Sequence, residues 1–250
     1  MSIDSRKALV VAAIVAFGLV AVLPCASAQT TARIPDLSGV YNIRTFRGGP
    51  LETMAVDLPG GKIPLLPTEE PRYRAFAKKQ MSNPDPADDQ SPSAHCLPPG
   101  LTFLMTAPYP IEIIQTPTKV LTFHEFGNFV RQIFLNRSGH GDPDPTWLGH
   151  SIGHYEGDTL VVDTVGFNGK AWLDLTGLRG TDVLHTVERF RKVNGELEWT
   201  VTIEDKKMFT QPFVVQAMYR PLPDFDINEY VCLENNTMLG SPGMKIAPAR

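Results

Sequence analysis

The adjacent residues Asn194 and Gly195 most strongly constrain what this sequence can fold into. They lie between two stretches in which apolar and polar residues alternate, and Asn-Gly is the strongest short signal for a two-residue β-hairpin turn. A hairpin closed there pairs an acid with a base and two aromatic residues across the strands, as cross-strand energetics favour: Arg191 opposite Glu198 and Phe190 opposite Trp199. The sequence therefore predicts an architecture built from hairpins.

Other turns extend this prediction along the chain. Residues 116–119 separate two apolar stretches, with Pro117 where a type I turn accepts it. Gly127-Asn128 is a second hairpin turn, which would place His124 opposite Arg131. A third turn is expected at Glu156-Gly157, and further strands are expected at 37–43, 212–219 and 228–232.

These turns divide the chain into about ten short strands. One helix is also expected, from its N-cap Thr68 to Lys79. A meander of this kind must hide its edges, and closure into a barrel does so. We therefore expect a mainly β fold, an antiparallel, up-and-down, lipocalin-like β-barrel of about ten strands with one short helix. A two-sheet sandwich is the alternative.

The N-terminus has the pattern of a secretory signal. Arg6 and Lys7 precede the apolar run 8–23, and the small residues 26–28 fit a cleavage site. We expect a signal peptide over 1–28, a single domain over 29–250, and a periplasmic or secreted protein with no stable membrane insertion after cleavage. An uncleaved anchor is the alternative, although the apolar run is shorter than the ~20 residues of a membrane span.

Cleavage would remove one of the three cysteines and leave Cys96 and Cys232. An oxidising compartment favours a disulfide between them, and two separate buried thiols are the alternative.

Composition narrows the function classes. The chain carries a formal net charge of −4, which excludes a nucleic-acid binder that works by bulk charge. It contains no Walker loop, dinucleotide fingerprint, zincin helix or Cys-x-x-Cys motif. We therefore expect no cofactor, and a small molecule as ligand or substrate; the oligomeric state stays open.

The candidate chemistry lies between His140 and Asp163. A two-residue turn at Glu156-Gly157 would pair His150 with Asp163, and a three-residue turn with a bulge would place Asp163 opposite Gly149, still diagonal to His150. With either turn we expect the imidazole and the carboxylate within reach of each other, and a carboxylate beside an imidazole fixes its tautomer and raises its basicity. His150, Asp163 and His140, the last from the preceding loop, are the predicted catalytic residues. A His–Asp hydrogen bond that merely stabilises the barrel wall is the alternative.

Other polar and aromatic residues complete the predicted site. The expected substrate-binding residues are Trp147, His154, His124, Arg131 and Tyr109. The asparagine-glycine register also places His185 opposite Glu204, either in a second polar cluster or, preferably, in a solvated outer row. A metal ion held by His140, Asp142 and His150 is the least favoured option, because His150 and His154 would lie ~13 Å apart on a strand.

The segment 145–164 reads PTWLGHSIGHYEGDTLVVDT and resembles a family of exported bacterial proteins that is largely uncharacterised. The resemblance extends to 96–100, 108–110, 188–190 and 229–235. The family often has a basic residue and a Trp where this chain has His154 and Tyr155. Separately, residues 37–41 resemble the opening Gly-x-Trp strand of lipocalin-like barrels, with Tyr41 replacing Trp. That resemblance implies a fold and no particular activity.

Three functions remain in order of preference. The first is a cofactor-free lyase, isomerase or hydratase that uses His150 and Asp163 for acid–base chemistry on a small apolar or aromatic compound. The second is a lipocalin-like protein that binds a small ligand without catalysis. The third is a metal-dependent hydrolase.

Overall fold

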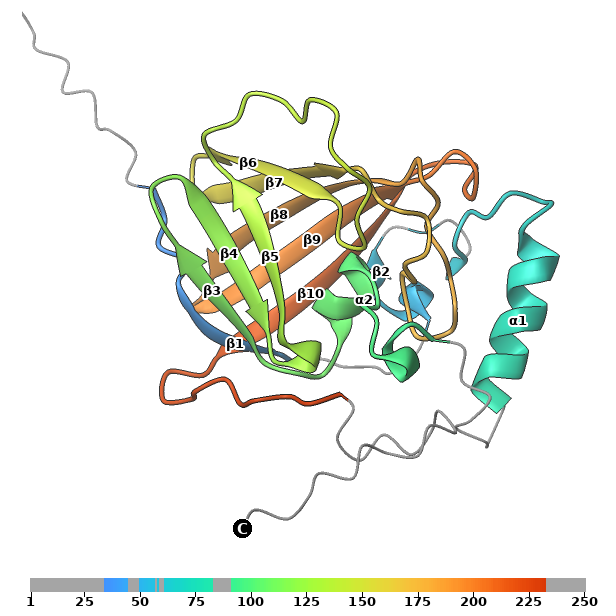
Figure 1. Cartoon of the computed structure of the whole chain (residues 1–250), viewed down its shortest axis with the longest axis horizontal. Coiled ribbons are helices and arrows are strands. Elements are labelled where there is room, and N and C mark those ends of the chain that lie inside the picture. The colour runs from blue at the N-terminus through green and yellow to red at the C-terminus, as the bar shows by residue number, and fades with distance from the viewer. Residues whose placement is uncertain (1–33, 45–49, 57, 59–60, 83–90, 233–250) are drawn as a thin grey trace, which may run out of the picture. The chain divides into compact units, whose positions relative to one another are not determined.

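Ten strands form the body of the protein in the computed structural model (Figure 1), which describes residues 34–44, 50–56, 58, 61–82 and 91–232. The predicted signal peptide, 1–28, lies outside the described residues. The strands are β1 (Gly39–Ile43), β2 (Ala55–Val56), β3 (Ile111–Gln115), β4 (Lys119–His124), β5 (Phe129–Phe134), β6 (His150–Glu156), β7 (Thr159–Val165), β8 (His185–Val193), β9 (Glu196–Glu204) and β10 (Phe213–Pro221).

Nine of these strands close into a barrel in the order β1-β3-β4-β5-β6-β7-β8-β9-β10, and β10 pairs back with β1. β2 lies outside the ring and pairs with β10. This confirms the predicted mainly β barrel, with one departure from the all-antiparallel arrangement. β5 and β6 run parallel, because the segment 135–149 crosses over between them where a tight turn would have reversed the chain. Figure 1 shows this segment as the large loop beside β6.

The asparagine-glycine hairpin forms as predicted. Asn194 and Gly195 both have positive φ angles, 52° and 84°, as the favoured hairpin turn requires. The register sets Arg191 opposite Glu198 and Phe190 opposite Trp199. Arg191 Nε donates a hydrogen bond of 2.7 Å to Glu198. The turn at 116–119 is also confirmed, between β3 and β4.

The other two predicted turns are each displaced along the chain. A short 3-10 helix, Phe126–Asn128, fills the β4–β5 connection, so Arg131 lies opposite Thr122 and His124 lies opposite Phe129. The β6–β7 turn consists of Gly157 and Asp158, so Asp163 lies opposite Ile152. The predicted pairings of His124 with Arg131 and of His150 with Asp163 are therefore wrong by two residues. A shift of two keeps every side chain on its predicted face, because strand side chains alternate with period two.

Two α-helices lie in the described part of the chain. α1 (Glu70–Ser82) corresponds to the predicted helix, and α2 (Leu101–Thr106) was not predicted. All six residues of α2 are buried at the barrel end, where Tyr219 Oη donates a hydrogen bond to the Met105 carbonyl oxygen. A short apolar run without a polar face shows no helical periodicity, which is why the sequence did not predict it. Neither helix combines the length and apolar character needed to cross a membrane.

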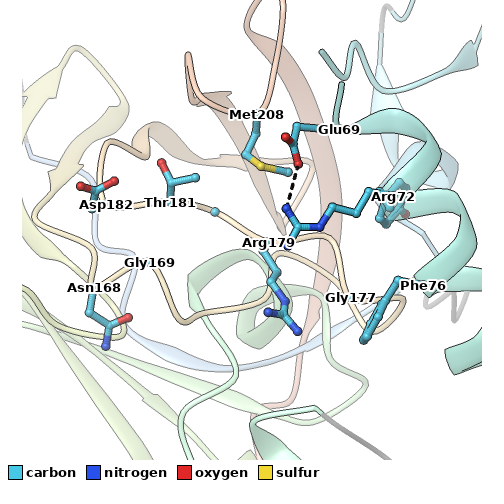
Figure 2. Close-up of a pocket in the computed structure, with 12 residues that line it drawn as sticks. Glu69, Arg72, Phe76, Asn168, Gly169, Gly177, Arg179, Thr181, Asp182 and Met208 are labelled. Carbon is cyan, nitrogen blue, oxygen red and sulfur yellow. Dashed lines mark ion pairs between the residues drawn. The ribbon is translucent and has the colours of Figure 1, made fainter. Parts of the chain in front are cut away.

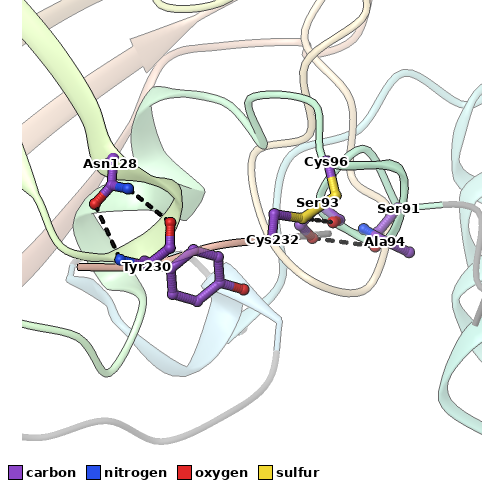
Figure 3. Close-up of a disulfide and its surroundings, with 7 residues drawn as sticks. All are labelled: Ser91, Ser93, Ala94, Cys96, Asn128, Tyr230 and Cys232. Atoms are coloured by element: carbon purple, nitrogen blue, oxygen red, sulfur yellow. Dashed lines mark hydrogen bonds between the residues drawn. A yellow bond between two sulfur atoms is a disulfide. The ribbon is translucent and has the colours of Figure 1, made fainter. Parts of the chain in front are cut away.

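Residues 228–232 form an extended arm instead of the predicted strand. The Asn228 backbone N–H donates to Glu125 Oε2 over 3.0 Å, and Asn128 side-chain Nδ2 donates to the Tyr230 carbonyl oxygen over 2.6 Å. The arm ends at the disulfide between Cys96 and Cys232, whose Cα atoms are 5.6 Å apart (Figure 3). The predicted disulfide is confirmed, and it fastens the arm to the segment that precedes α2.

Candidate functional site

The strands β6 and β7 present one set of polar side chains to the barrel interior and another to the outside. Ser151 and Thr164 are almost fully buried and lie directly opposite each other. By alternation, His150 and Asp163 point outward, and both are half-buried. The interior and exterior groups are therefore two separate clusters.

The interior cluster is centred on an ion pair between Arg131 and Glu188, whose side chains are 2% and 0% exposed. Arg131 Nη1 donates to Glu188 Oε1 over 3.0 Å, and Nη2 donates to Oε2. Its other hydrogen bonds go to Ser151 Oγ (3.0 Å) and Thr164 Oγ1 (2.9 Å). Trp199 Nε1 donates to Glu188 over 2.9 Å. A charged pair buried with this many partners is typical of a structural element.

His124 also lies inside the barrel. Burial, and then the positive charge of Arg131, lower the pKa of His124 to about 3, so the ring is neutral. Nε2 is 3.0 Å from Thr122 Oγ1, while Nδ1 has no hydrogen-bond partner among the described residues.

The exterior cluster is a continuous line of five side chains, which we name the histidine chain: Arg137, His150, His140, Asp163 and His185. Arg137 Nη1 is 2.9 Å from His150 Nε2, and His150 Nδ1 is 2.8 Å from His140 Nδ1. His140 Nε2 is 2.7 Å from Asp163 Oδ1. His185 Nε2 approaches Asp163 Oδ2 at 2.8 Å from the neighbouring strand.

Only one set of proton positions satisfies all of these contacts with neutral rings on His150 and His140. Arg137 can only donate, so His150 Nε2 accepts and His150 carries its proton on Nδ1. That proton is donated to His140 Nδ1, and His140 therefore donates from Nε2 to Asp163. The chain thus has a direction, from the guanidinium through two neutral imidazoles to the carboxylate.

Electrostatics agree with this assignment. Burial, and then electrostatic interaction with the neighbouring imidazole of His140 and the guanidinium of Arg137, hold the pKa of His150 below its ordinary value. Burial raises the pKa of Asp163, but the hydrogen bonds from His185 and His140 outweigh it, so the pKa lies below the usual value. At neutral pH, His150 is a neutral base and Asp163 is a carboxylate.

A surface cavity of about 340 Å³ lies beside His150, between β5 and the segment that leads into β6. The His150 ring stacks on Phe134 with centroids 5.4 Å apart. Its lining residues combine apolar groups with a few polar ones: Pro98, Val130, Arg131, Gln132, Phe134, Thr146, Trp147, Leu148, Gly149, His150 and Ser151. One end of the histidine chain therefore opens on a cavity large enough for a small molecule.

The structure places the predicted catalytic residues, His150, Asp163 and His140, in one hydrogen-bonded group, although His140 stands between the other two. Among the predicted substrate-binding residues, Trp147 and the buried Arg131 both line the cavity beside His150.

The remaining predicted binding residues lie elsewhere. His124 is enclosed in the barrel, and His154 lies at the exposed end of β6, 3.2 Å from Glu156. Tyr109 stacks on Phe126 beside the C-terminal arm, with ring centroids 4.9 Å apart.

Sequence reasoning missed the contributions of Arg137, Phe134 and His185 to this site. His185 is opposite Glu204 in the predicted register and lies on the outer face, with its Nδ1 3.7 Å from Glu204 Oε2. Its second contact, with Asp163, depends on the pairing of β7 with β8. These two strands are joined by the irregular segment 166–184. It contains the pair Asn168-Gly169, but this pair does not join two strands directly, so the register of β7 with β8 could not be derived from it.

A metal site is not formed by the residues considered for one. His140 and His150 contact each other directly through Nδ1, and Asp142 lies in an exposed part of their loop. Within the described ranges, no three His, Cys, Asp or Glu side chains are arranged to hold a metal ion.

No family model and no curated protein matches the sequence. Among solved structures, the chain is similar to a REP1-NXSQ fatty acid transporter, with 11% sequence identity and a TM-score of 0.31. The match covers 54% of this chain and 88% of the other. At this TM-score, the similarity says nothing about the ligand or activity of this chain.

Proposed function

We propose that this protein is an exported, cofactor-free acid–base enzyme, a lyase, isomerase or hydratase, acting on a small apolar or aromatic molecule. The observation that carries the proposal is the histidine chain, in which His150 lies beside a cavity. Export is part of the proposal: the 1–28 segment has a signal-peptide pattern, and the Cys96–Cys232 disulfide fits an oxidising compartment.

His150 is the proposed general base. Its lowered pKa keeps the imidazole neutral, and Nε2 is the nitrogen that carries the lone pair. When Nε2 takes a proton, the new positive charge is stabilised through His140 by the Asp163 carboxylate. An acid–base group oriented in this way contributes ~10²–10⁴-fold to a proton-transfer rate.

Arg137 has a separate proposed role. It is exposed, and its guanidinium lies over the Phe134 ring, 3.8 Å from the ring centroid. A substrate carbonyl or carboxylate oxygen would accept the N–H that now points at His150 Nε2. This change of hydrogen-bond partner frees the lone pair of His150 Nε2. It also leaves the guanidinium of Arg137 beside the substrate oxygen on which negative charge develops.

Trp147, Leu148 and Phe134 give the cavity its apolar surface. Its volume of about 340 Å³ is at the lower end of the range for small-molecule pockets. The proposed substrate is therefore a compact apolar or aromatic compound with an acidic C–H next to an oxygen function.

The test is proton exchange, which requires no knowledge of the product. Purified mature protein would be incubated in D₂O with small aryl ketones such as phenylacetone, and deuterium uptake at the carbon next to the carbonyl would be followed by mass spectrometry. We expect enzyme-dependent exchange that falls at least ~100-fold in His150→Gln and clearly in Asp163→Asn.

His154→Gln is the matched control, because it changes a histidine on the same face of the same strand whose side chain hydrogen-bonds, within the described part of the chain, to Glu156 alone. It should exchange at the wild-type rate. Equal rates in His150→Gln and wild-type protein would contradict the proposed base.

Ligand binding without catalysis is the second candidate, and one contact favours it. In the structure, Arg137 already occupies the lone pair of His150 Nε2, so this nitrogen is not free to take a proton, while the stacked rings of His150 and Phe134 still offer a ligand an apolar surface. Binding of the aryl ketones with no deuterium uptake in any variant would support this function over the first.

A further inference from the structure

A second and larger cavity, of about 460 Å³, lies between α1 and the β7–β8 loop (Figure 2). It shares no lining residue with the cavity beside His150. Figure 2 shows Arg72 reaching across from the helix, with Asn168 and Asp182 on the opposite side. The lining consists of Glu69, Arg72, Tyr73, Phe76, Asn168, Gly169, Gly177, Arg179, Gly180, Thr181, Asp182 and Met208.

Buried carboxylates fix the loop wall of this cavity. Asp174 is 2% exposed and accepts hydrogen bonds from the backbone N–H groups of Leu51 (2.9 Å) and Thr176 (3.0 Å). Asp205, also buried, accepts from the Thr181 backbone N–H over 2.6 Å. The helix wall is joined to the loop where the Tyr73 hydroxyl lies 2.7 Å from Thr176 Oγ1. The cavity is therefore preformed.

Gly177 leaves room for the Phe76 ring to form one wall of this cavity. It has φ of +89°, and a Cβ built on it would lie 2.3 Å from Phe76 Cε1. Any other residue would therefore displace the ring. Phe76 in turn meets the buried Trp172 edge-on, with ring centroids 5.7 Å apart.

Arg179 stands out among the charged groups of the lining. Asp182 pairs with Lys207 at 2.6 Å and Glu69 with Arg72 at 4.0 Å, whereas Arg179 has no ion pair with any described residue. Its guanidinium is instead 5.4 Å from the Phe76 centroid and 5.8 Å from that of Trp172. A guanidinium held over aromatic rings keeps its in-plane N–H groups available, and these match a carboxylate in a bidentate geometry.

We infer that this cavity binds a small aromatic carboxylate, whose ring contacts Phe76 and whose carboxylate pairs with Arg179. Arg72 adds a second positive charge, since its contact with Glu69 is long and 84% of its side chain is exposed. The lining also contains the carboxylates of Glu69 and Asp182, whose negative charge disfavours a ligand with two negative charges. A ligand with one carboxylate therefore matches the charge of the cavity.

Titration calorimetry on the purified mature protein tests this inference, with benzoate and 2-naphthoate as probes and benzamide as the neutral analogue of benzoate. We expect the carboxylates to bind and benzamide to bind at least ~10-fold more weakly, because a charge-assisted hydrogen bond is lost. Arg179→Gln should weaken benzoate by a similar factor. Arg189→Gln, an exposed arginine on β8 that pairs with Glu156, is the control and should bind as wild type does.

The outcome is independent of the proposed acid–base function. Benzoate should bind His150→Gln with wild-type affinity, even if no exchange activity is found. Equal affinities for benzoate and benzamide, or unchanged affinity in Arg179→Gln, would overturn the inference. So would a loss of benzoate binding in His150→Gln, since it would locate the ligand in the other cavity.

Discussion

The interior ion-pair cluster and the histidine chain share three strands, whose two faces they occupy. Arg131 of β5 and Trp199 of β9 complete the first group, and Arg137 and His140 of the β5–β6 crossover complete the second. β6, β7 and β8 direct Ser151, Thr164 and Glu188 inward. The residues next to the first two, His150 and Asp163, point outward, as does His185. Alternation therefore places two polar groups back to back on one stretch of sheet.

The two groups differ in how far they are exposed. The interior group is buried: Arg131 and Glu188 hydrogen-bond to buried side chains, and of this group Arg131 and Ser151 line the cavity wall. The histidine chain is half-buried, places His150 beside the cavity and ends in the exposed Arg137. A buried ion pair can stabilise the fold, whereas a neutral imidazole beside a cavity can exchange protons with a ligand. Substitutions should separate these roles.

The largest expected effect is on the interior side. Glu188→Gln keeps the shape of the side chain but leaves the Arg131 charge buried without its counter-charge. Breaking a buried ion pair in this way costs about 3–5 kcal/mol of the free energy of unfolding. Urea unfolding followed by circular dichroism measures it.

The double variant Arg131→Met with Glu188→Leu is the control. It removes both charges, so it should recover most of the stability lost in Glu188→Gln. A single variant that loses less than about 1 kcal/mol would show that the interior pair is solvated and that the two clusters differ less than the geometry indicates.

His124 should make the barrel sensitive to acid. Its pKa is about 3 in the folded protein and about 6.5 when unfolded, so the unfolded chain binds the extra proton between these values. Its contribution is therefore fully present above pH 6.5 and is lost as the pH falls. About 3 kcal/mol should disappear between pH 8 and pH 4.5.

His124→Asn should remove this part of the pH dependence, leaving a flatter curve of unfolding free energy against pH. His154→Asn, at an exposed position, should leave the wild-type curve unchanged. If both variants give the wild-type slope, the imidazole of His124 is not kept neutral by the barrel interior.

Much of the fold could be predicted because local turn chemistry determines strand pairing. Asn194-Gly195 set one register correctly, and the displaced turns at 126–128 and 157–158 changed two registers by two residues without changing a face. The parallel pairing of β5 with β6 could not be derived, since it depends on how a long loop crosses the barrel end.

Within the candidate site, only the placement of residues that belong to one hairpin could be predicted from the sequence, because turn chemistry determines only local strand pairing. His150 and Asp163 belong to adjacent strands of one hairpin, so their shared face followed from alternation. The contact of His185 with Asp163 joins strands separated by 166–184, and Arg137 belongs to the β5–β6 crossover. Contacts made through long connections depend on tertiary packing, for which a single sequence contains no periodic signal.

Neighbouring residues on β6 give a more direct comparison of the two clusters. Ser151→Ala removes the acceptor of Arg131 Nε, so it should cost about 1–2 kcal/mol of unfolding free energy. Ser151 also lines the cavity, but it forms no hydrogen bond with the histidine chain among the described residues, so proton exchange should fall far less than in His150→Gln. His150→Gln should lose exchange with a smaller loss of stability. Exchange rates and unfolding free energies of both variants separate the two roles, and a loss of exchange in Ser151→Ala as large as that in His150→Gln would contradict the separation.

The smallest expected effect concerns the open end of the histidine chain. Arg137→Gln removes a positive charge from His150 Nε2, so the pKa of His150 should rise, while burial and His140 still hold it below the ordinary value. Histidine chemical shifts followed by NMR between pH 4 and pH 8 report this directly, and Arg189→Gln serves as the control because that arginine contacts Glu156. The side-chain amide introduced by Arg137→Gln can still donate a hydrogen bond to His150 Nε2. A change in the pKa of His150 would therefore report the lost positive charge and not a lost hydrogen bond. An unchanged pKa would mean that Arg137 is screened by solvent, and His150 would then owe its neutrality to burial and its histidine neighbour alone.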